Sequence, residues 1–237
     1  MPLNDKKTLY VHHHLGLGDH LHCNGLVRYM LKNFECDGVS LFAKHYDLVN
    51  YMYRDDDDIE VIEVDGNNER NSVDELYRAL STQEDSFLRI GHGYYRGDVD
   101  KNCWEVFYEQ VNVPHDARHK YFYFERDLKE EERVFNKMNP ENVPFIFMHD
   151  DPARGHKIDR SKFLNSNLKV IENDPSENIF HFMKIIEEAE EVHTMESCFK
   201  TLIEFYSKTD NMIYHDIRNH PLGQSIKSWK VVSYAKS

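Results

Sequence analysis

The apolar positions of the chain fall into short runs that are separated by longer, partly polar segments. The runs predict buried strands at residues 8–14, 39–43, 59–64, 87–90, 144–149, 168–172, 191–194 and 212–214. Between them, apolar residues recur at helical spacing at 20–32, 46–53, 72–80, 100–110, 127–138, 179–189 and 197–206. Strands that alternate with helices predict parallel sheets covered by helices on both faces. The pattern therefore predicts an α/β fold.

The alternation of strands and helices occurs twice along the chain. A connector near residue 113 separates the two series. We therefore expect two small Rossmann-like domains, residues 1–113 and residues 114–237, that face each other across a cleft. A chain of 237 residues is long enough for each domain to bury a core.

The charge and the cysteines narrow the class of function. The formal net charge is −13 at pH 7, which opposes binding to nucleic acid or to an anionic membrane surface. The four cysteines contain no CxxC pair, so buried thiols are favoured over zinc ligands or a disulfide framework. No apolar run approaches the roughly 18 residues of a transmembrane helix, and no signal segment precedes the first strand. We expect a cytoplasmic protein without a transmembrane segment.

The first candidate motif is Leu-Gly-Leu-Gly-Asp at residues 15–19, between the first predicted strand and its helix. Gly16 and Gly18 would let the backbone approach a ligand, and the helix amino terminus favours an anion. Asp19 beside such a site is a candidate general base, with His20 and His22 as substitutes. The motif lacks the third glycine of a dinucleotide fingerprint. A simple strand-to-helix turn with a capping aspartate is the alternative.

The second candidate motif follows the strand at 144–149. His149, Asp150 and Arg154 lie just past its carboxyl end, which is where open α/β sheets bind ligands. The planar guanidinium of Arg154 matches the oxygens of a diphosphate. Asp150 and Asp151 could instead hold a divalent metal ion, and a plain polar turn is the third possibility.

The third candidate motif is a strand-to-helix junction that contains His193, Glu196 and Ser197. Ser197 and the free amides of the helix could receive a phosphate, and Glu196 could accept hydrogen bonds from ribose hydroxyls. The alternative is an ordinary helix cap, which uses the same residue types.

Three further residues are candidate contacts for a second substrate. His92 and Arg96 follow the strand at 87–90, on the side where the cleft is expected, and His14 ends the first predicted strand.

Together, the Leu-Gly-Leu-Gly-Asp motif and the segment His-Thr-Met-Glu-Ser-Cys-Phe at 193–199 resemble heptosyltransferase-like glycosyltransferases of the GT-B type. The resemblance covers most of the chain in layout but only these short motifs in residues. It implies that the C-terminal domain binds a nucleotide-sugar donor and that the N-terminal domain binds the acceptor. It also implies that Asp19 is the base and that Glu196 and Ser197 belong to the donor-binding segment.

The expected function is therefore transfer of a sugar from a nucleoside-diphosphate sugar to a hydroxyl of a carbohydrate or glycoconjugate. We expect inversion at the anomeric carbon, no metal ion and no cofactor besides the donor. Two alternatives remain open at this stage. One is a nucleotide- or carbohydrate-binding protein without turnover, and the other is a metal-dependent transferase or phosphatase that uses Asp150 and Asp151.

Overall fold

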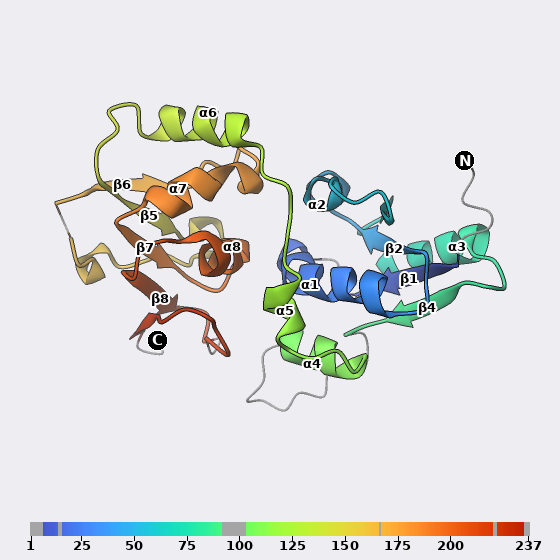
Figure 1. The fold of residues 1–237 in the computed structure, drawn as a ribbon. Helices are drawn as coiled ribbons and strands as arrows, with labels where there is room; N and C mark the ends of the chain where they lie inside the picture. The colour runs from blue at the N-terminus through green and yellow to red at the C-terminus, as the bar shows by residue number, and fades with distance from the viewer. Residues whose placement is uncertain (1–6, 14–15, 92–102, 166, 220–221, 235–237) are drawn as a thin grey trace. The chain divides into compact units, whose positions relative to one another are not determined.

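The chain contains two compact units, Met1–Glu125 and Arg126–Ser237. The computed structural model describes residues 7–13, 16–91, 103–165, 167–219 and 222–234. Each unit is built on one parallel sheet, and Figure 1 colours the first unit from blue to green and the second from yellow-green to red. The predicted α/β class with two parallel sheets is thus confirmed.

The first unit has a four-stranded sheet in the order β3-β2-β1-β4. Its elements are β1 (Thr8–His12), α1 (Leu17–Asn33), β2 (Gly38–Ala43), α2 (Tyr46–Tyr53), β3 (Ile59–Glu63), α3 (Glu69–Leu80), β4 (Ser86–Arg89), α4 (Cys103–Gln110) and α5 (Ala117–Lys120). The central strands β1 and β2 are almost wholly buried, as expected where helices cover both faces of a parallel sheet. Tyr10 and Phe42 pack on Val73 of α3 in one part of this core.

The second unit has a five-stranded sheet in the order β6-β5-β7-β8-β9. Its elements are α6 (Leu128–Met138), β5 (Phe145–His149), η1 (Pro152–Arg154), η2 (Arg160–Lys162), β6 (Lys169–Glu172), η3 (Ile179–Phe182), α7 (Met183–Glu188), β7 (Glu191–Thr194), α8 (Cys198–Tyr206), β8 (Met212–Asp216) and β9 (Lys230–Ser233). Aromatic rings form much of its core, since Phe147 of β5 packs against Phe182 and Phe199. The sequence pattern ended at β8, so β9 is a strand that the prediction missed. Its burial is low along its whole length, and an exposed edge strand of this kind carries no strong apolar signal.

The boundary between the units follows Glu125 and not residue 113. The reason is a tight contact between α1 and the segment that follows residue 113. A side chain at Gly25 would have its Cβ 2.6 Å from the carbonyl oxygen of Ala117, so only a glycine admits α5 at this distance. Asn24 then binds the backbone of Tyr123 twice, through its Oδ1 and Nδ2 atoms. Residues 114–125 therefore complete the first unit.

Strand order creates one switch point in each sheet. In the first sheet the chain adds β2 and β3 on one side of β1 and then places β4 on the other side. In the second sheet β6 and β7 flank β5 in the same way. Ligands of open α/β sheets bind beyond the carboxyl ends of the strands at such points. Candidate ligand-binding residues are therefore expected at the carboxyl end of β1 in the first unit and at the carboxyl ends of β5 and β7 in the second.

Candidate functional site

In the first unit, Asp19 lies in the first turn of α1, close to the carboxyl end of β1. The helix begins at Leu17, earlier than expected, so Gly18 and Asp19 are helical residues and Gly16 is the residue that caps the helix. A Cβ atom on Gly16 would lie 2.8 Å from the Oδ2 atom of Asp19. The carboxylate thus folds back over Gly16, where the absence of a side chain makes room for it. The positive end of the helix dipole stabilises a carboxylate in this first turn.

His20, one of the two substitutes for Asp19, points into the core. Its side chain is fully buried, and its ring lies 4.3 Å from the ring of His13. Burial, followed by the nearby charges of His13, His45 and Lys44, lowers the pKa of His20 well below its ordinary value. The imidazole of His20 is therefore neutral at pH 7.

His22, the other substitute, faces a buried arginine. Its Nδ1 atom lies 3.2 Å from an Nη atom of Arg118, whose guanidinium also packs on the ring of Trp104. A guanidinium only donates hydrogen bonds, so the Nδ1 atom of His22 accepts and its proton sits on Nε2. Arg118 was not singled out from the sequence, because it occurs in a segment that looks like a connector.

Three candidate residues, His14, His92 and Arg96, lie outside the described residues. The notion that they contact an acceptor therefore remains a prediction from the sequence.

In the second unit, His149 ends β5 as predicted and is held by the loop after β6. Its Nδ1 atom lies 2.7 Å from the Oδ1 atom of Asn173, and its ring packs against Phe199 of α8. Burial lowers the pKa of His149, while the hydrogen bond to Asn173 and the charges of Asp150 and Asp151 act in the opposite direction. Asn173 belongs to no motif and was therefore not predicted from the sequence.

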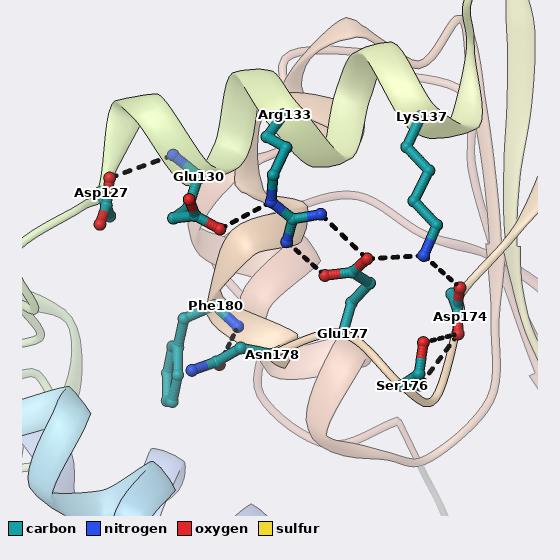
Figure 2. Close-up of polar contacts among 9 residues, drawn as sticks. All are labelled: Asp127, Glu130, Arg133, Lys137, Asp174, Ser176, Glu177, Asn178 and Phe180. Carbon is teal, nitrogen blue, oxygen red and sulfur yellow. Dashed lines mark hydrogen bonds and ion pairs between the residues drawn. The ribbon is translucent and has the colours of Figure 1, made fainter.

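The loop that carries Asn173 is fastened to α6 by ion pairs, which Figure 2 shows. Glu177 accepts hydrogen bonds from Arg133 at 2.5 and 3.1 Å and from Lys137 at 2.6 Å. Lys137 also binds Asp174 at 2.8 Å. Hydrogen bonds from Arg133 and then Lys137 lower the pKa of Glu177 to about 2. We call this group (Arg133, Lys137, Asp174 and Glu177) the α6 brace.

The connection that follows β5 starts with a closed turn. Asp151 and His156 exchange two backbone hydrogen bonds of 2.9 Å, and Gly155 between them has a φ of 79°, a left-handed conformation that favours glycine. Asp150 accepts a hydrogen bond from the amide of Ile158. Arg154 projects from this turn with 71% of its side chain exposed and lies 3.4 Å from Asp151. The turn thus directs a guanidinium outward beyond the end of β5.

More basic residues follow Arg154 in the same connection. Lys157, Arg160 and Lys162 are all exposed, although Arg160 forms an ion pair with Glu172 of β6. Of these four cations, only Arg154 was predicted from the sequence to bind a ligand. The cluster of cations could have been noticed, since it stands out in a chain with a net charge of −13.

The junction between β7 and α8 places Glu196 and Ser197 where the sequence predicted them. Ser197 is the capping residue of α8, and its Oγ atom accepts a hydrogen bond from the amide of Lys200. Glu196 is half-buried, with the ammonium of Lys200 3.6 Å from its carboxylate and with its backbone carbonyl bound by Arg218. The capping alternative is therefore realised at Ser197. A cap of this kind still leaves helix amides at the carboxyl edge of the sheet.

His193 lies deeper than a ligand contact would require. Its side chain is fully buried in β7, and its two ring nitrogens bind Glu191 and His215. In this conformation His193 is a buried part of the second unit and not a side chain at its surface.

Three further observations concern metal ligands, membrane helices and cavities among the described residues. Across them, no group of three or more His, Cys, Asp or Glu side chains is arranged to hold a metal ion. Their helices include none with both the length and the apolar character that a membrane crossing requires. A cavity of about 550 Å³ in the first unit is lined by Thr8, Gly38 and Ile59, which begin β1, β2 and β3. It therefore opens at the sheet edge opposite Asp19.

The sequence and the fold were compared with those of known proteins. No family model and no curated protein matches the sequence. Among solved structures, the chain is similar to the glycosyl transferase family 9 protein of Veillonella parvula DSM 2008, with a TM-score of 0.64 and 11% identity over 98% of this chain and 88% of that one. It is also similar to the Escherichia coli heptosyltransferase WaaC with ADP-2-deoxy-2-fluoro heptose, with a TM-score of 0.51 and 11% identity over 95% of this chain and 92% of that one.

Both likenesses extend over nearly the whole chain, so they include both parallel sheets. They agree with the resemblance that the sequence motifs suggested. At 11% identity, the two likenesses show the fold but not the roles of single residues. The chain therefore has the two-unit α/β fold of these glycosyltransferase structures.

Proposed function

We propose that this protein is a glycosyltransferase that moves a sugar from a nucleoside-diphosphate sugar to an acceptor hydroxyl. The observation that carries the proposal is the position of the candidate residues. Asp19, Arg154 and Ser197 lie beyond the carboxyl ends of β1, β5 and β7, which are the switch-point strands of the two sheets. The likeness in fold to two glycosyltransferases supports the same conclusion.

The donor is assigned to the second unit. Arg154 offers an exposed guanidinium that fits two diphosphate oxygens at once, and Lys157 adds a second exposed cation nearby in sequence. The amides of α8 and the hydroxyl of Ser197 can bind a phosphate oxygen. Glu196 accepts hydrogen bonds from the ribose in this assignment, and His149 lines the same edge of the sheet. The similar E. coli structure contains an ADP-sugar analogue, which is consistent with a nucleoside-diphosphate sugar here.

The acceptor is assigned to the first unit, with Asp19 as the general base. The carboxylate takes the proton from the acceptor hydroxyl as its oxygen attacks the anomeric carbon. The bond between that carbon and the diphosphate oxygen breaks in the same step, so the nucleoside diphosphate leaves and the anomeric centre is inverted. His20 and His22 are less suited to the task, because one is sealed in the core and the other faces Arg118.

The leaving diphosphate gains negative charge as the bond breaks. Arg154 and Lys157, together with the amino end of α8, can stabilise that charge electrostatically. Both carboxylates have partners within the same connection. Asp150 accepts a hydrogen bond from the amide of Ile158, and Asp151 forms an ion pair with Arg154. We therefore propose a reaction in which protein cations replace a divalent metal ion.

The experiment that tests this proposal is thermal unfolding with UDP, GDP, ADP, CDP or dTDP, each with and without EDTA. A ligand present at 100 times its dissociation constant should stabilise the fold by about 2.7 kcal/mol. We expect stabilisation by one nucleotide, unchanged by EDTA and lost in the double variant Arg154→Ala, Lys157→Ala. Stabilisation that EDTA removes would favour a metal-dependent enzyme that uses Asp150 and Asp151. No stabilisation by any nucleotide would overturn the proposal.

Binding alone does not distinguish a transferase from a nucleotide-binding protein without turnover. Release of free nucleoside diphosphate from the matching nucleotide sugar, in the presence of candidate acceptors, makes that distinction. A protein that binds the nucleotide and releases none from any sugar donor would be a binding module.

A further inference from the structure

A row of buried polar side chains crosses the second sheet where apolar residues would be expected. Glu191 and His193 lie on the same face of β7, and His215 lies on the neighbouring strand β8. All three are fully buried. Burying a charged or polar group is costly unless its hydrogen bonds are satisfied, so this row needs an explanation.

The row is a continuous chain of hydrogen bonds. The Nε2 atom of His193 lies 2.5 Å from Glu191, and its Nδ1 atom lies 2.7 Å from the Nε2 atom of His215. The Nδ1 atom of His215 lies 2.7 Å from the hydroxyl of Tyr234, which follows β9. The Tyr234 oxygen in turn accepts a hydrogen bond of 3.0 Å from the amide of Asp159. We call these four residues, Glu191, His193, His215 and Tyr234, the histidine chain.

One arrangement of protons satisfies every link of the histidine chain. With Glu191 ionised, His193 donates from Nε2 and accepts at Nδ1 from His215. His215 then accepts at its own Nδ1 from the hydroxyl of Tyr234. Both imidazoles are neutral in this arrangement, and each ring nitrogen has one partner.

The histidine chain ends on the connection between β5 and β6. Besides Asp159 at one end, the amides of Leu164 and Asn165 and the side chain of Asn165 donate to the Glu191 carboxylate at the other end, at 2.8 to 3.1 Å. Between them, the ring of Phe163 packs on His193 with the centroids 4.2 Å apart. In the described part of this connection, the regular structure consists of two short 3₁₀ turns, η1 and η2. Its backbone amides therefore need partners from outside the segment.

We propose that the histidine chain is a positioning device that holds residues 158–165 against the second sheet. By fixing that stretch, it sets where the preceding turn with Arg154 and Lys157 stands beyond the carboxyl end of β5. The second half of this inference rests on the proposed function, because there the turn receives the donor diphosphate. His193 thus acts through other residues and is not itself a ligand contact.

The histidine chain also makes the position of the connection depend on pH. The charged groups that act on the two imidazoles are Glu191 of β7, Lys230 of β9 and Asp159 of the connection itself. Burial lowers the pKa of His193, and burial together with His193 lowers the pKa of His215 to about 4. A histidine with a lowered pKa stabilises the folded form fully above about pH 6.5, and that stabilisation is lost as the pH falls toward 4. We expect the connection to loosen in this interval.

The test removes one hydroxyl and keeps the fold. Tyr234→Phe breaks the link between His215 and the amide of Asp159. Its effect is measured by hydrogen exchange of residues 158–165 and by the rate of trypsin cleavage in the connection. Trypsin can cleave after four exposed residues there, Arg154, Lys157, Arg160 and Lys162. We expect both rates to rise about three- to tenfold, the change in equilibrium that one hydrogen bond is worth. The control is Tyr123→Phe, which removes a hydroxyl from a half-exposed tyrosine of the first unit.

A second variant tests the histidines and the pH dependence. His215→Phe should lower the protection of residues 158–165 against exchange at pH 7. It should also diminish the loss of protection, measured relative to the intrinsic exchange rate, that we expect for the unmodified protein between pH 6.5 and pH 4. Equal exchange in Tyr234→Phe and the unmodified protein would overturn the positioning role. A pH response of undiminished size in His215→Phe would overturn its dependence on pH.

The same variants separate this inference from the proposed function. If the unmodified protein binds a nucleotide, Tyr234→Phe should weaken that binding. If no nucleotide binds, the proposed function fails, while the exchange data still decide whether the histidine chain holds the connection. Faster exchange with unchanged nucleotide affinity would overturn the link to Arg154 and Lys157 only.

Discussion

The carboxyl edges of the two sheets hold their candidate residues in opposite ways. In the first unit, Gly16 lies in the same helix turn as Asp19 and leaves room for its carboxylate. In the second unit, residues from separate loops meet at the edge, and distant partners hold them. Asp159 and Tyr234, which bind each other there, are 75 residues apart in sequence.

The contrast matches the tasks that we propose for the two edges. A general base must present one group at a defined point, which a helix turn can do alone. A diphosphate site needs several cations and amides from different segments, and each segment must be fixed separately. We therefore expect changes at the first edge to act mainly on turnover, and changes at the second edge to act in smaller steps on binding and stability.

The largest effect should come from Asp19→Asn. The amide keeps the shape of the side chain but cannot take a proton, so turnover should fall by about 10²- to 10⁴-fold, the usual contribution of a general base. Nucleotide affinity should stay unchanged, because the donor is assigned to the other unit. Steady-state rates and thermal stabilisation by the nucleotide check both expectations. An equal loss in His20→Gln, with full activity in Asp19→Asn, would move the base to the histidine.

A smaller effect should come from Gly16→Ala, which tests the local device itself. The new Cβ atom would stand 2.8 Å from the Oδ2 atom of Asp19 and would displace the carboxylate. A shift of about 1 Å in a reacting group can lower the rate by as much as about 10²-fold, so a tenfold to hundredfold fall in kcat is expected, with little change in KM for the donor. The matched control is Gly66→Ala, where a Cβ atom meets only the flexible Lys44 side chain at 3.4 Å. Equal rates for the two variants would show that Gly16 has no such role.

The same contrast explains what could be predicted from the sequence. Asp19, Gly16 and Ser197 were predicted because their neighbours along the chain create the relevant geometry, namely a strand end followed by a helix start. Both parallel sheets followed from the alternation of apolar runs and helical spacing. Local signals of this kind can be recognised in a single sequence.

The partners that hold the second edge could not be predicted in this way. Asn173 and Tyr234 act through hydrogen bonds to His149 and Asp159, and nothing near them in sequence marks those contacts. His193 was assigned to the donor from its place in a motif, yet its burial depends on a connection some thirty residues earlier. The boundary between the units lies later in the chain than predicted for a similar reason. It depends on the contact of Gly25 with Ala117, which forms only when the chain folds.

The smallest effect should come from the α6 brace, which acts on the edge of the second sheet only through the loop that carries Asn173. Glu177→Gln removes the charge that Arg133 and Lys137 share. It should lower the free energy of unfolding at pH 7 by at most about 1 kcal/mol, because the two cations are nearly half exposed and ion pairs in contact with solvent contribute little. The lowered pKa of Glu177 fixes the sign of the pH dependence, because a carboxylate of this kind stabilises the fold above about pH 4.5 and loses its effect as the pH falls toward 2.

Urea unfolding at pH 7 and at pH 3.5 measures this difference. The gap between Glu177→Gln and the unmodified protein should be larger at pH 7, whereas Glu188→Gln, a control on the exposed face of α7, should show no gap at either pH. Hydrogen exchange near Asn173 should rise in Glu177→Gln, because the brace holds the loop that binds His149. If stability falls but exchange near Asn173 does not, the α6 brace stabilises the second unit without positioning its edge, and the contrast between the two edges rests on the histidine chain alone.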